Sequence, residues 1–167
     1  MRLHKFLSLL FVLSCCAVAT HAAAQSPATM AASFNPNTVP LGPAFPTILT
    51  ITITNPNLAL PLTNVAFNNT APNGLTLVTQ TGGTCSTVAT GGGMFTINPG
   101  NGTFSSTSAV LAPGQSCDIT VRMYATISGE IIDTTSTVTS NEAPPGEPAF
   151  AILNAPTPVR LQGFEVD

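Results

Sequence analysis

The residues of this chain that could carry out chemistry are few, and most of them are carboxylates. Glu130 and Asp133 stand three positions apart, and glycoside hydrolases work with a pair of carboxylic groups. Together with Asp118, the same pair could hold Ca²⁺, which prefers oxygen ligands. The spacing matches no known calcium loop, however, and no aromatic platform accompanies the pair. We interpret Glu130 and Asp133 as solvated charges on a strand edge, which discourage pairing between sheets, and we predict no catalytic residue and no metal site.

Histidine, lysine and reactive cysteine support most other catalytic and metal sites. Both histidines, the single lysine and two of the four cysteines lie within the first 24 residues, at His4, His21, Lys5, Cys15 and Cys16. Without that segment, a Ser-His-Asp triad, a Ser-Lys dyad and a histidine-ligated zinc site are all impossible. An enzyme is therefore the least favoured class, and no cofactor is expected.

Residues 1–24 have the pattern of a secretory signal peptide. Arg2 and Lys5 precede an apolar run over 6–18, and three alanines at 22–24 provide a cleavage site. The apolar run is too short for a stable membrane span, and no later segment could serve as one. We expect cleavage near Ala24 and a secreted, extracellular or cell-surface protein.

A lipoprotein is the alternative for the same segment. Val12-Leu13-Ser14-Cys15 loosely resembles a lipobox, in which Cys15 would carry the lipid anchor. The apolar stretch before Cys15 is short and Leu13 is unusual there, so we favour cleavage near Ala24.

Charge limits the partners of the exported chain. After residue 24 the only bases are Arg122 and Arg160, against seven acidic residues, so the formal charge is 2 − 7 = −5. No basic patch can form, which excludes nucleic acid and anionic lipid as partners. An extracellular protein or a glycan remains, although a glycan site would favour Trp or several Tyr, and the chain has no Trp and one Tyr. The sequence indicates neither the binding residues nor the oligomeric state.

The stretch 111–125, a turn at Pro113-Gly114 followed by a strand, is the one around which the domain is expected to form. The odd positions of the strand, Cys117, Ile119, Val121 and Met123, alternate with polar residues, which is the pattern of a half-buried strand. After residue 24 the only other cysteine is Cys85. In an oxidising compartment we predict a Cys85–Cys117 disulfide, which closes a loop of about 33 residues and contributes roughly 3–4 kcal/mol of stability.

The rest of the chain reads as further short strands separated by turns. Charged residues make up only 7% of the chain, and Thr, Ser, Asn, Pro and Gly, which suit strands and tight turns, take their place. Strands are predicted at 34–37, 47–54, 62–70, 75–79, 94–97, 103–111, 131–140 and 149–153. Asn73-Gly74 predicts a hairpin between its flanking strands, and Pro113-Gly114 another. Eight or nine short strands without a helical pattern predict an all-β, immunoglobulin-like β-sandwich with one disulfide.

Around this domain, assigned to 33–154, the sequence predicts two flanking segments. Residues 25–32 show no periodicity and are expected to be a flexible leader. Residues 155–167 contain two prolines and an apolar alternation over 159–164, so they are either a tail or an extra strand. Such a strand could add to the sheet of a neighbouring subunit.

Three segments in order resemble a known family: F-N-P-N-T-V-P-L-G at 34–42, L-T-I-T-I-T-N-P-N at 49–57 and L-A-P-G-Q-S-C-D-I-T-V at 111–121. They are similar to the Ig-like "conserved repeat" domains of unknown function in large bacterial surface and secreted proteins. The resemblance covers roughly 33–153. It implies a sandwich of seven or eight strands and a spacer or adhesive role, and it brings no catalytic residues.

The relatives are often tandem arrays, whereas this chain has one copy, which weakens the spacer role. The expected function is therefore that of a non-enzymatic secreted or cell-surface module with a structural or adhesive role. The alternatives are a module that binds a glycan or a protein, and a self-assembling subunit that uses an edge strand or the C-terminal tail.

Overall fold

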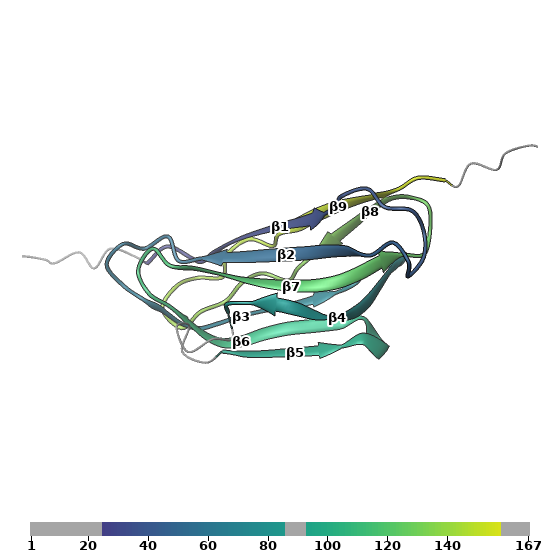
Figure 1. Cartoon of the computed structure of the whole chain (residues 1–167). Coiled ribbons are helices and arrows are strands. Elements are labelled where there is room, and N and C mark those ends of the chain that lie inside the picture. Colours follow the sequence, from purple (N-terminus) through teal and green to yellow (C-terminus); the bar gives the residue numbers. More distant parts are fainter. Residues whose placement is uncertain (1–24, 86–92, 158–167) are drawn as a thin grey trace, which may run out of the picture.

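The computed structural model describes residues 25–85 and 93–157, which form two packed layers of β-strands (Figure 1). The predicted signal peptide with its cleavage near Ala24, the alternative lipid site at Cys15 and most of the predicted tail lie outside the described residues. Within the described ranges, no helix is long and apolar enough to cross a membrane. The prediction of an all-β fold is confirmed.

The described residues contain nine strands, arranged in three sheets, and one short 3-10 helix. The elements are β1 (Thr29–Asn35), β2 (Thr47–Thr54), β3 (Leu62–Thr70), β4 (Leu75–Gly83), β5 (Met94–Asn98), η2 (Pro99–Asn101), β6 (Thr103–Leu111), β7 (Ser116–Ala125), β8 (Gly129–Thr134) and β9 (Phe150–Ala155). A four-stranded sheet has the order β1-β2-β7-β4, a three-stranded sheet has the order β3-β6-β5, and β8 pairs with β9. All these pairs are antiparallel.

The β8–β9 hairpin joins the layer of the three-stranded sheet. Beyond β8 the chain runs beside β3, where Ala66 and Thr139 exchange backbone hydrogen bonds of 3.0 and 2.9 Å. On its other side β9 meets the β1–β2 connection, because Val39 N donates to Asn154 O at 3.0 Å and Asn154 N donates to Asn37 O at 2.8 Å. The hairpin therefore closes one side of the sandwich.

The core lies between the two layers and follows the predicted alternation. Leu49, Ile51 and Ile53 of β2 are fully buried beside Val121 of β7. From the second layer, β3 and β6 contribute apolar side chains that include Phe67 and Phe104, whose rings meet edge-to-face at 6.3 Å. Apolar burial of this kind is the main stabilising contribution to the sandwich.

Two predicted hairpins are crossovers between sheets instead. Asn73-Gly74 joins β3 to β4, but β3 pairs with β6 and β4 pairs with β7. Pro113-Gly114 joins β6 to β7, which also belong to different sheets. Gly74 and Gly114 do adopt the positive φ expected of turn glycines, 96° and 69°. A tight turn reverses the chain equally well when its strands face each other across the core, so the predicted pairings are wrong.

The prediction of a flexible leader over 25–32 is wrong for its second half. β1 begins at Thr29 and pairs with β2 along its whole length, from Thr29 opposite Thr54 to Asn35 opposite Ile48. Backbone hydrogen bonds to the edge of β2 form this strand, and they require no alternation of side chains. The leader is attached even earlier, because Ser26 and the side chain of Asn57 exchange two hydrogen bonds of 2.9 Å.

Candidate functional site

The carboxylates that could do chemistry do not converge. Glu130 and Asp133 both lie on β8, but positions three apart on a strand face opposite sides. Glu130 is exposed, whereas Asp133 is 1% exposed. Asp118 lies on β7, in the other sheet. Among the described residues, no group of three or more His, Cys, Asp or Glu side chains could hold a metal ion.

Asp133 is a buried group rather than the solvated edge charge that the sequence predicted. It shares the inward face of β8 with Ile131, which is 4% exposed, while Ile132 between them is 50% exposed. The alternation Ile131-x-Asp133 contains this signal. The prediction was wrong because a charged residue was assigned to the solvent by its type and not by its position on the strand.

Asn69 of β3 is the partner of this buried carboxyl. Its amide Nδ2 donates to Asp133 Oδ2 at 2.7 Å. Burial raises the pKa of Asp133 from 3.8 to about 6, although the hydrogen bond from Asn69 lowers it in part. The other side-chain oxygen of each residue, Oδ1, is buried without a hydrogen-bond partner. Sequence reasoning missed this pair, whose members are 64 positions apart.

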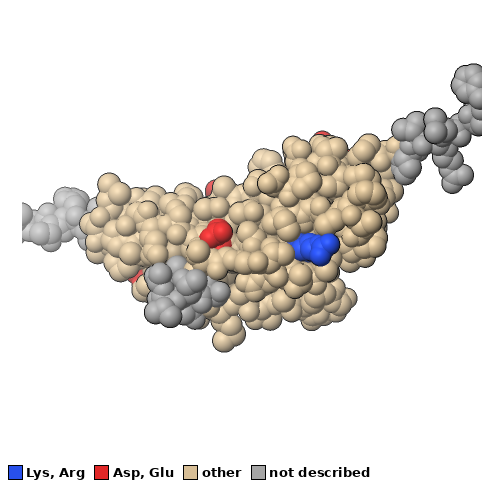
Figure 2. All heavy atoms as spheres, viewed as in Figure 1, with Lys and Arg blue, Asp and Glu red and all other residues tan. Residues whose placement is uncertain are grey.

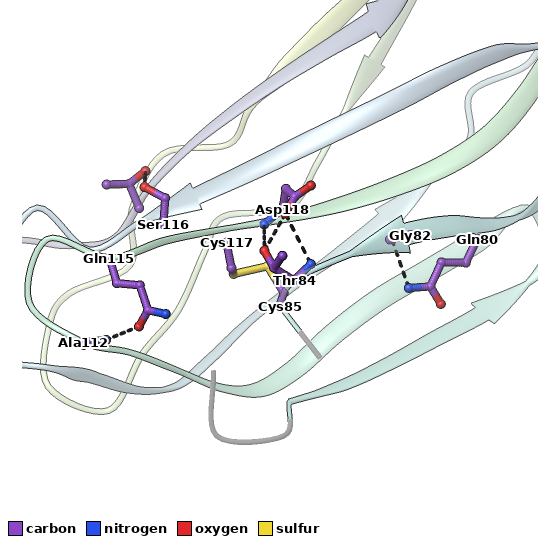
Figure 3. The surroundings of a disulfide bond; sticks show 10 residues. Gln80, Gly82, Thr84, Cys85, Ala112, Gln115, Ser116, Cys117 and Asp118 are labelled. Atoms are coloured by element: carbon purple, nitrogen blue, oxygen red, sulfur yellow. Dashed lines mark hydrogen bonds between the residues drawn. A yellow bond between two sulfur atoms is a disulfide. The ribbon is translucent and has the colours of Figure 1, made fainter. Parts of the chain in front are cut away.

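The predicted disulfide is present and lies at the end of β4 (Figure 3). Cys85 and Cys117 are bonded, with their Cα atoms 4.9 Å apart, and both are buried. Beside them, Thr84 N donates to Asp118 O at 2.8 Å and Asp118 N donates to Thr84 Oγ1 at 3.0 Å. A covalent bond and a set of hydrogen bonds therefore hold the end of β4 against β7.

The outer face of the three-stranded sheet is polar, and its strands contribute no charged side chain. The described strands β3, β5 and β6 and the segment 135–139 contain no acidic or basic residue. We call this surface the uncharged face, and it consists of the outward side chains of those four segments. Cross-strand register arranges six of them in two rows, Asn68-Ser105-Thr96 and Thr70-Thr103-Asn98.

Two shallow hollows lie on the uncharged face. The first, of about 250 Å³, is lined by both rows of polar side chains. The second, of about 230 Å³, lies between β3, β6 and the segment after β8, and is lined by Thr107, Ser136 and Thr139 among others. Asn68 borders both hollows. Hydroxyl and amide groups in these positions can donate and accept hydrogen bonds, and they carry no net charge.

The opposite face of the sandwich is different. Figure 2 shows a mostly tan surface with one blue group and a few red ones. The outer face of β7 carries Arg122 and Asp118. Arg122 is the only Lys or Arg among the described residues. Asp118 and Arg122 lie on the same outer face of β7, because the odd positions of this strand are buried.

A protein-family model matches almost all of the described domain. The model of a domain of unknown function, DUF7933, matches residues 28–155. The chain belongs to this family. None of the curated proteins matches it by sequence.

Solved structures share the fold at low sequence identity. A variant of BcpA, the major pilin subunit of Bacillus cereus, matches with a TM-score of 0.54 and 12% identity over 75% of this chain and 40% of the pilin. The collagen adhesin of S. aureus gives 0.52 and 12%, over 75% of this chain and 48% of the adhesin. A cohesin of Acetivibrio cellulolyticus, solved in complex with a dockerin, gives 0.53 and 10%, over 77% of this chain and all of the cohesin.

These matches confirm the predicted immunoglobulin-like sandwich. At such identities they show the fold alone, and the domain spans less than half the length of the pilin and of the adhesin. Membership of the DUF7933 family agrees with the expectation of a domain of unknown function. The finer resemblance to "conserved repeat" domains stays a prediction.

Proposed function

We propose that this DUF7933 domain is a non-enzymatic module that acts outside the cell or on its surface, in a structural or adhesive role, and that it binds its partner through the uncharged face. The observation that supports this proposal is the registered array of hydroxyl and amide groups around two hollows, on strands without a single charge. Charged residues are depleted from the centres of protein interfaces because burying an unpaired charge is costly. A neutral polar face of this kind suits a neutral partner, either a protein surface or a glycan.

A structural role is supported by the course of the chain. The described chain enters beside the start of β1 and leaves after β9, at opposite ends of the elongated sandwich (Figure 1). A domain with this arrangement can be joined in series with others and can transmit tension along its length. Export by the predicted signal peptide belongs to the same proposal.

The binding test uses the full exported chain and immobilised neutral glycans and extracellular matrix proteins. Ser105→Lys places a charge at the centre of the uncharged face, where Ser105 pairs with both Asn68 and Thr96. Thr50→Lys is the matched control, because Thr50 lies on β2 in the other sheet. We expect Ser105→Lys to weaken binding at least about tenfold and Thr50→Lys to leave it unchanged. Equal losses in both variants, or a loss in neither, would contradict the proposed face.

Self-assembly is the second candidate, and a specific surface favours it. Ile132, Phe150 and Ile152 are 50%, 65% and 39% exposed on the outer face of the β8–β9 hairpin, and Ile132 pairs directly with Ile152. Exposed apolar clusters mark contact surfaces. If this face joins two copies, sedimentation will show an oligomer that Ile152→Glu dissociates. A monomer at every concentration tested would reject this candidate.

A further inference from the structure

The contact between Asp133 and Asn69 lies where the β8–β9 hairpin joins β3. Asp133 is 1% exposed on β8, and Asn69 is 2% exposed on β3. The 2.7 Å hydrogen bond between them crosses from one strand to the other. Beside it, Asn69 and Thr135 form an isolated backbone bridge. A change in the hydrogen bonding of this pair therefore affects the attachment of the β8–β9 hairpin to β3.

The pair has one hydrogen-bond donor too few. An ionised carboxylate accepts hydrogen bonds only, and so does an amide oxygen. Asp133 Oδ1 and Asn69 Oδ1 are both buried without a partner. If the nitrogen and oxygen of the Asn69 amide were exchanged, two oxygens would stand 2.7 Å apart. Both arrangements lack a donor, and a proton on Asp133 supplies one in either case.

No other ionisable group from the described strands faces Asp133. The strands β1, β2, β3, β4, β5, β6 and β9 contain no acidic, basic or tyrosine side chain. On β8, Glu130 is exposed on the opposite face. On β7, Asp118, Arg122 and Tyr124 alternate with the buried residues and so point away from the core. There is thus no cation to compensate a negative charge on Asp133.

We propose that at mildly acidic pH Asp133 is protonated in the folded protein and forms an acid–amide latch with Asn69, which holds the β8–β9 hairpin to β3 and opens when the proton is lost. In the closed latch, Asn69 Nδ2 donates to Asp133 Oδ2, and the proton on Asp133 Oδ1 is donated to Asn69 Oδ1. In the open latch, that proton has passed to solvent water. The carboxylate left behind has one donor in a buried site, which favours exposure of the hairpin to water.

The direction of the pH dependence follows from the number of protons that the folded and the unfolded states bind at a given pH. Burial raises the pKa of Asp133 from 3.8 to about 6, against the lowering effect of the Asn69 hydrogen bond. Between these two values the folded state binds more protons than the unfolded state, so stability decreases as pH rises through this window. The difference between the two values corresponds to a decrease in the folding equilibrium constant on the order of a hundredfold.

The first test measures the proton directly and then removes its site. In the ¹³C-labelled full chain, the Asp133 carboxyl carbon is expected to titrate near pH 6. Urea unfolding of the wild type is expected to show the decrease through the same window, and Asp133→Asn, which keeps a pair of complementary amide edges, is expected to abolish it. Glu130→Gln, on the exposed face of the same strand, is the matched control and keeps the wild-type decrease.

Asn69→Ala separates a proton-holding role from simple packing. It removes both the amide donor to Asp133 Oδ2 and the acceptor that the latch provides for the acid proton, so the titration midpoint of the Asp133 carboxyl carbon is expected to shift. Two results would overturn the proposal: a carboxyl carbon that titrates at or below 3.8, or an Asp133→Asn variant that loses stability through the wild-type window. If Asp133→Asn does not fold, the wild-type titration decides.

The opening of the hairpin has its own readout. Amide hydrogen exchange of β9 and of β2 is compared at about pH 5 and about pH 8, with correction for the intrinsic pH dependence of exchange. We expect protection of β9 to decrease at least about tenfold more than protection of β2. Equal decreases in both strands would show that the proton affects the whole domain, and would overturn the latch.

Discussion

The Cys85–Cys117 bond and the Asp133–Asn69 pair both tie neighbouring strands in the core, yet they depend on different conditions. The disulfide holds β4 to β7 in the four-stranded sheet, and the groups beside it are hydrogen-bonded. The pair holds β8 to β3 in the other layer and leaves two buried oxygens without partners. The first link responds to reductant and not to protons, whereas the second responds to protons and not to reductant. We call the side held by the disulfide the permanent side, because its link does not depend on pH, and the side held by the Asp133–Asn69 pair the conditional side, because its link does.

The largest expected effect is the removal of the permanent link. Cys85→Ala with Cys117→Ala is expected to lower the free energy of unfolding by roughly 3–4 kcal/mol, because the unfolded chain regains the freedom of the closed loop. Urea unfolding measures this loss, and reduced wild type is the matched control. The decrease in stability near pH 6 should persist in the variant. If it disappears, the two links are coupled and the comparison fails.

Core truncations beside each link come next. Leu153 on β9 and Ile119 on β7 are 0% and 2% exposed, and replacing either by alanine is expected to cost about 2–5 kcal/mol through the cavity left behind. The two losses should differ in their pH dependence. Once the hairpin is released, Leu153 is no longer packed in the core, so the loss in free energy of unfolding caused by Leu153→Ala decreases above about pH 6. The loss caused by Ile119→Ala stays constant. Parallel pH curves for the two variants would argue against a conditional side.

Removing the amide of the pair is expected to have a smaller effect. At acid pH, Asn69→Ala should cost about 1–3 kcal/mol, because the buried acid group loses its hydrogen-bond partner. Asn68→Ala, at the neighbouring exposed position, is the control and should change stability by less than about 0.5 kcal/mol. Similar losses for the two variants would show that the amide of Asn69 contributes nothing specific.

The smallest effect is expected at Glu142, an exposed carboxylate whose pKa is lowered, whereas that of Asp133 is raised. Slight burial raises its pKa, but hydrogen bonds from the side chain and backbone of Thr63 and from its own backbone outweigh this and lower the pKa below 4.5. Its contribution is therefore present above pH 4.5 and lost as pH falls through the lowered value. Glu142→Gln should cost about 0.5 kcal/mol or less in urea unfolding near neutral pH, since solvent screens the group. A cost above that of Asn69→Ala would reverse the ranking.

The sequence by itself determined most of the strands, although it missed the first half of β1. Residue types over 47–54, 62–70 and 103–111 predicted β2, β3 and β6 with the bounds that the structure has. It also predicted the disulfide, because only two cysteines follow residue 24 and Cys117 shares the apolar face of its strand. The strands are local features, and the disulfide has only one possible pairing after residue 24. Residue types and spacing are therefore sufficient to define both.

Only the tertiary structure decided which strands pair and what the inward carboxylate meets. A turn such as Asn73-Gly74 fixes a reversal of the chain, but whether the next strand joins the same sheet depends on the packing of the whole sandwich. The alternation of β8 places Asp133 inward, but Asn69 becomes its partner through contacts between segments 64 positions apart. Pairings over such distances depend on the summed burial of both layers, to which no single motif corresponds. The uncharged face is likewise brought together from separate strands, each of which reads in isolation as ordinary solvent-facing sequence.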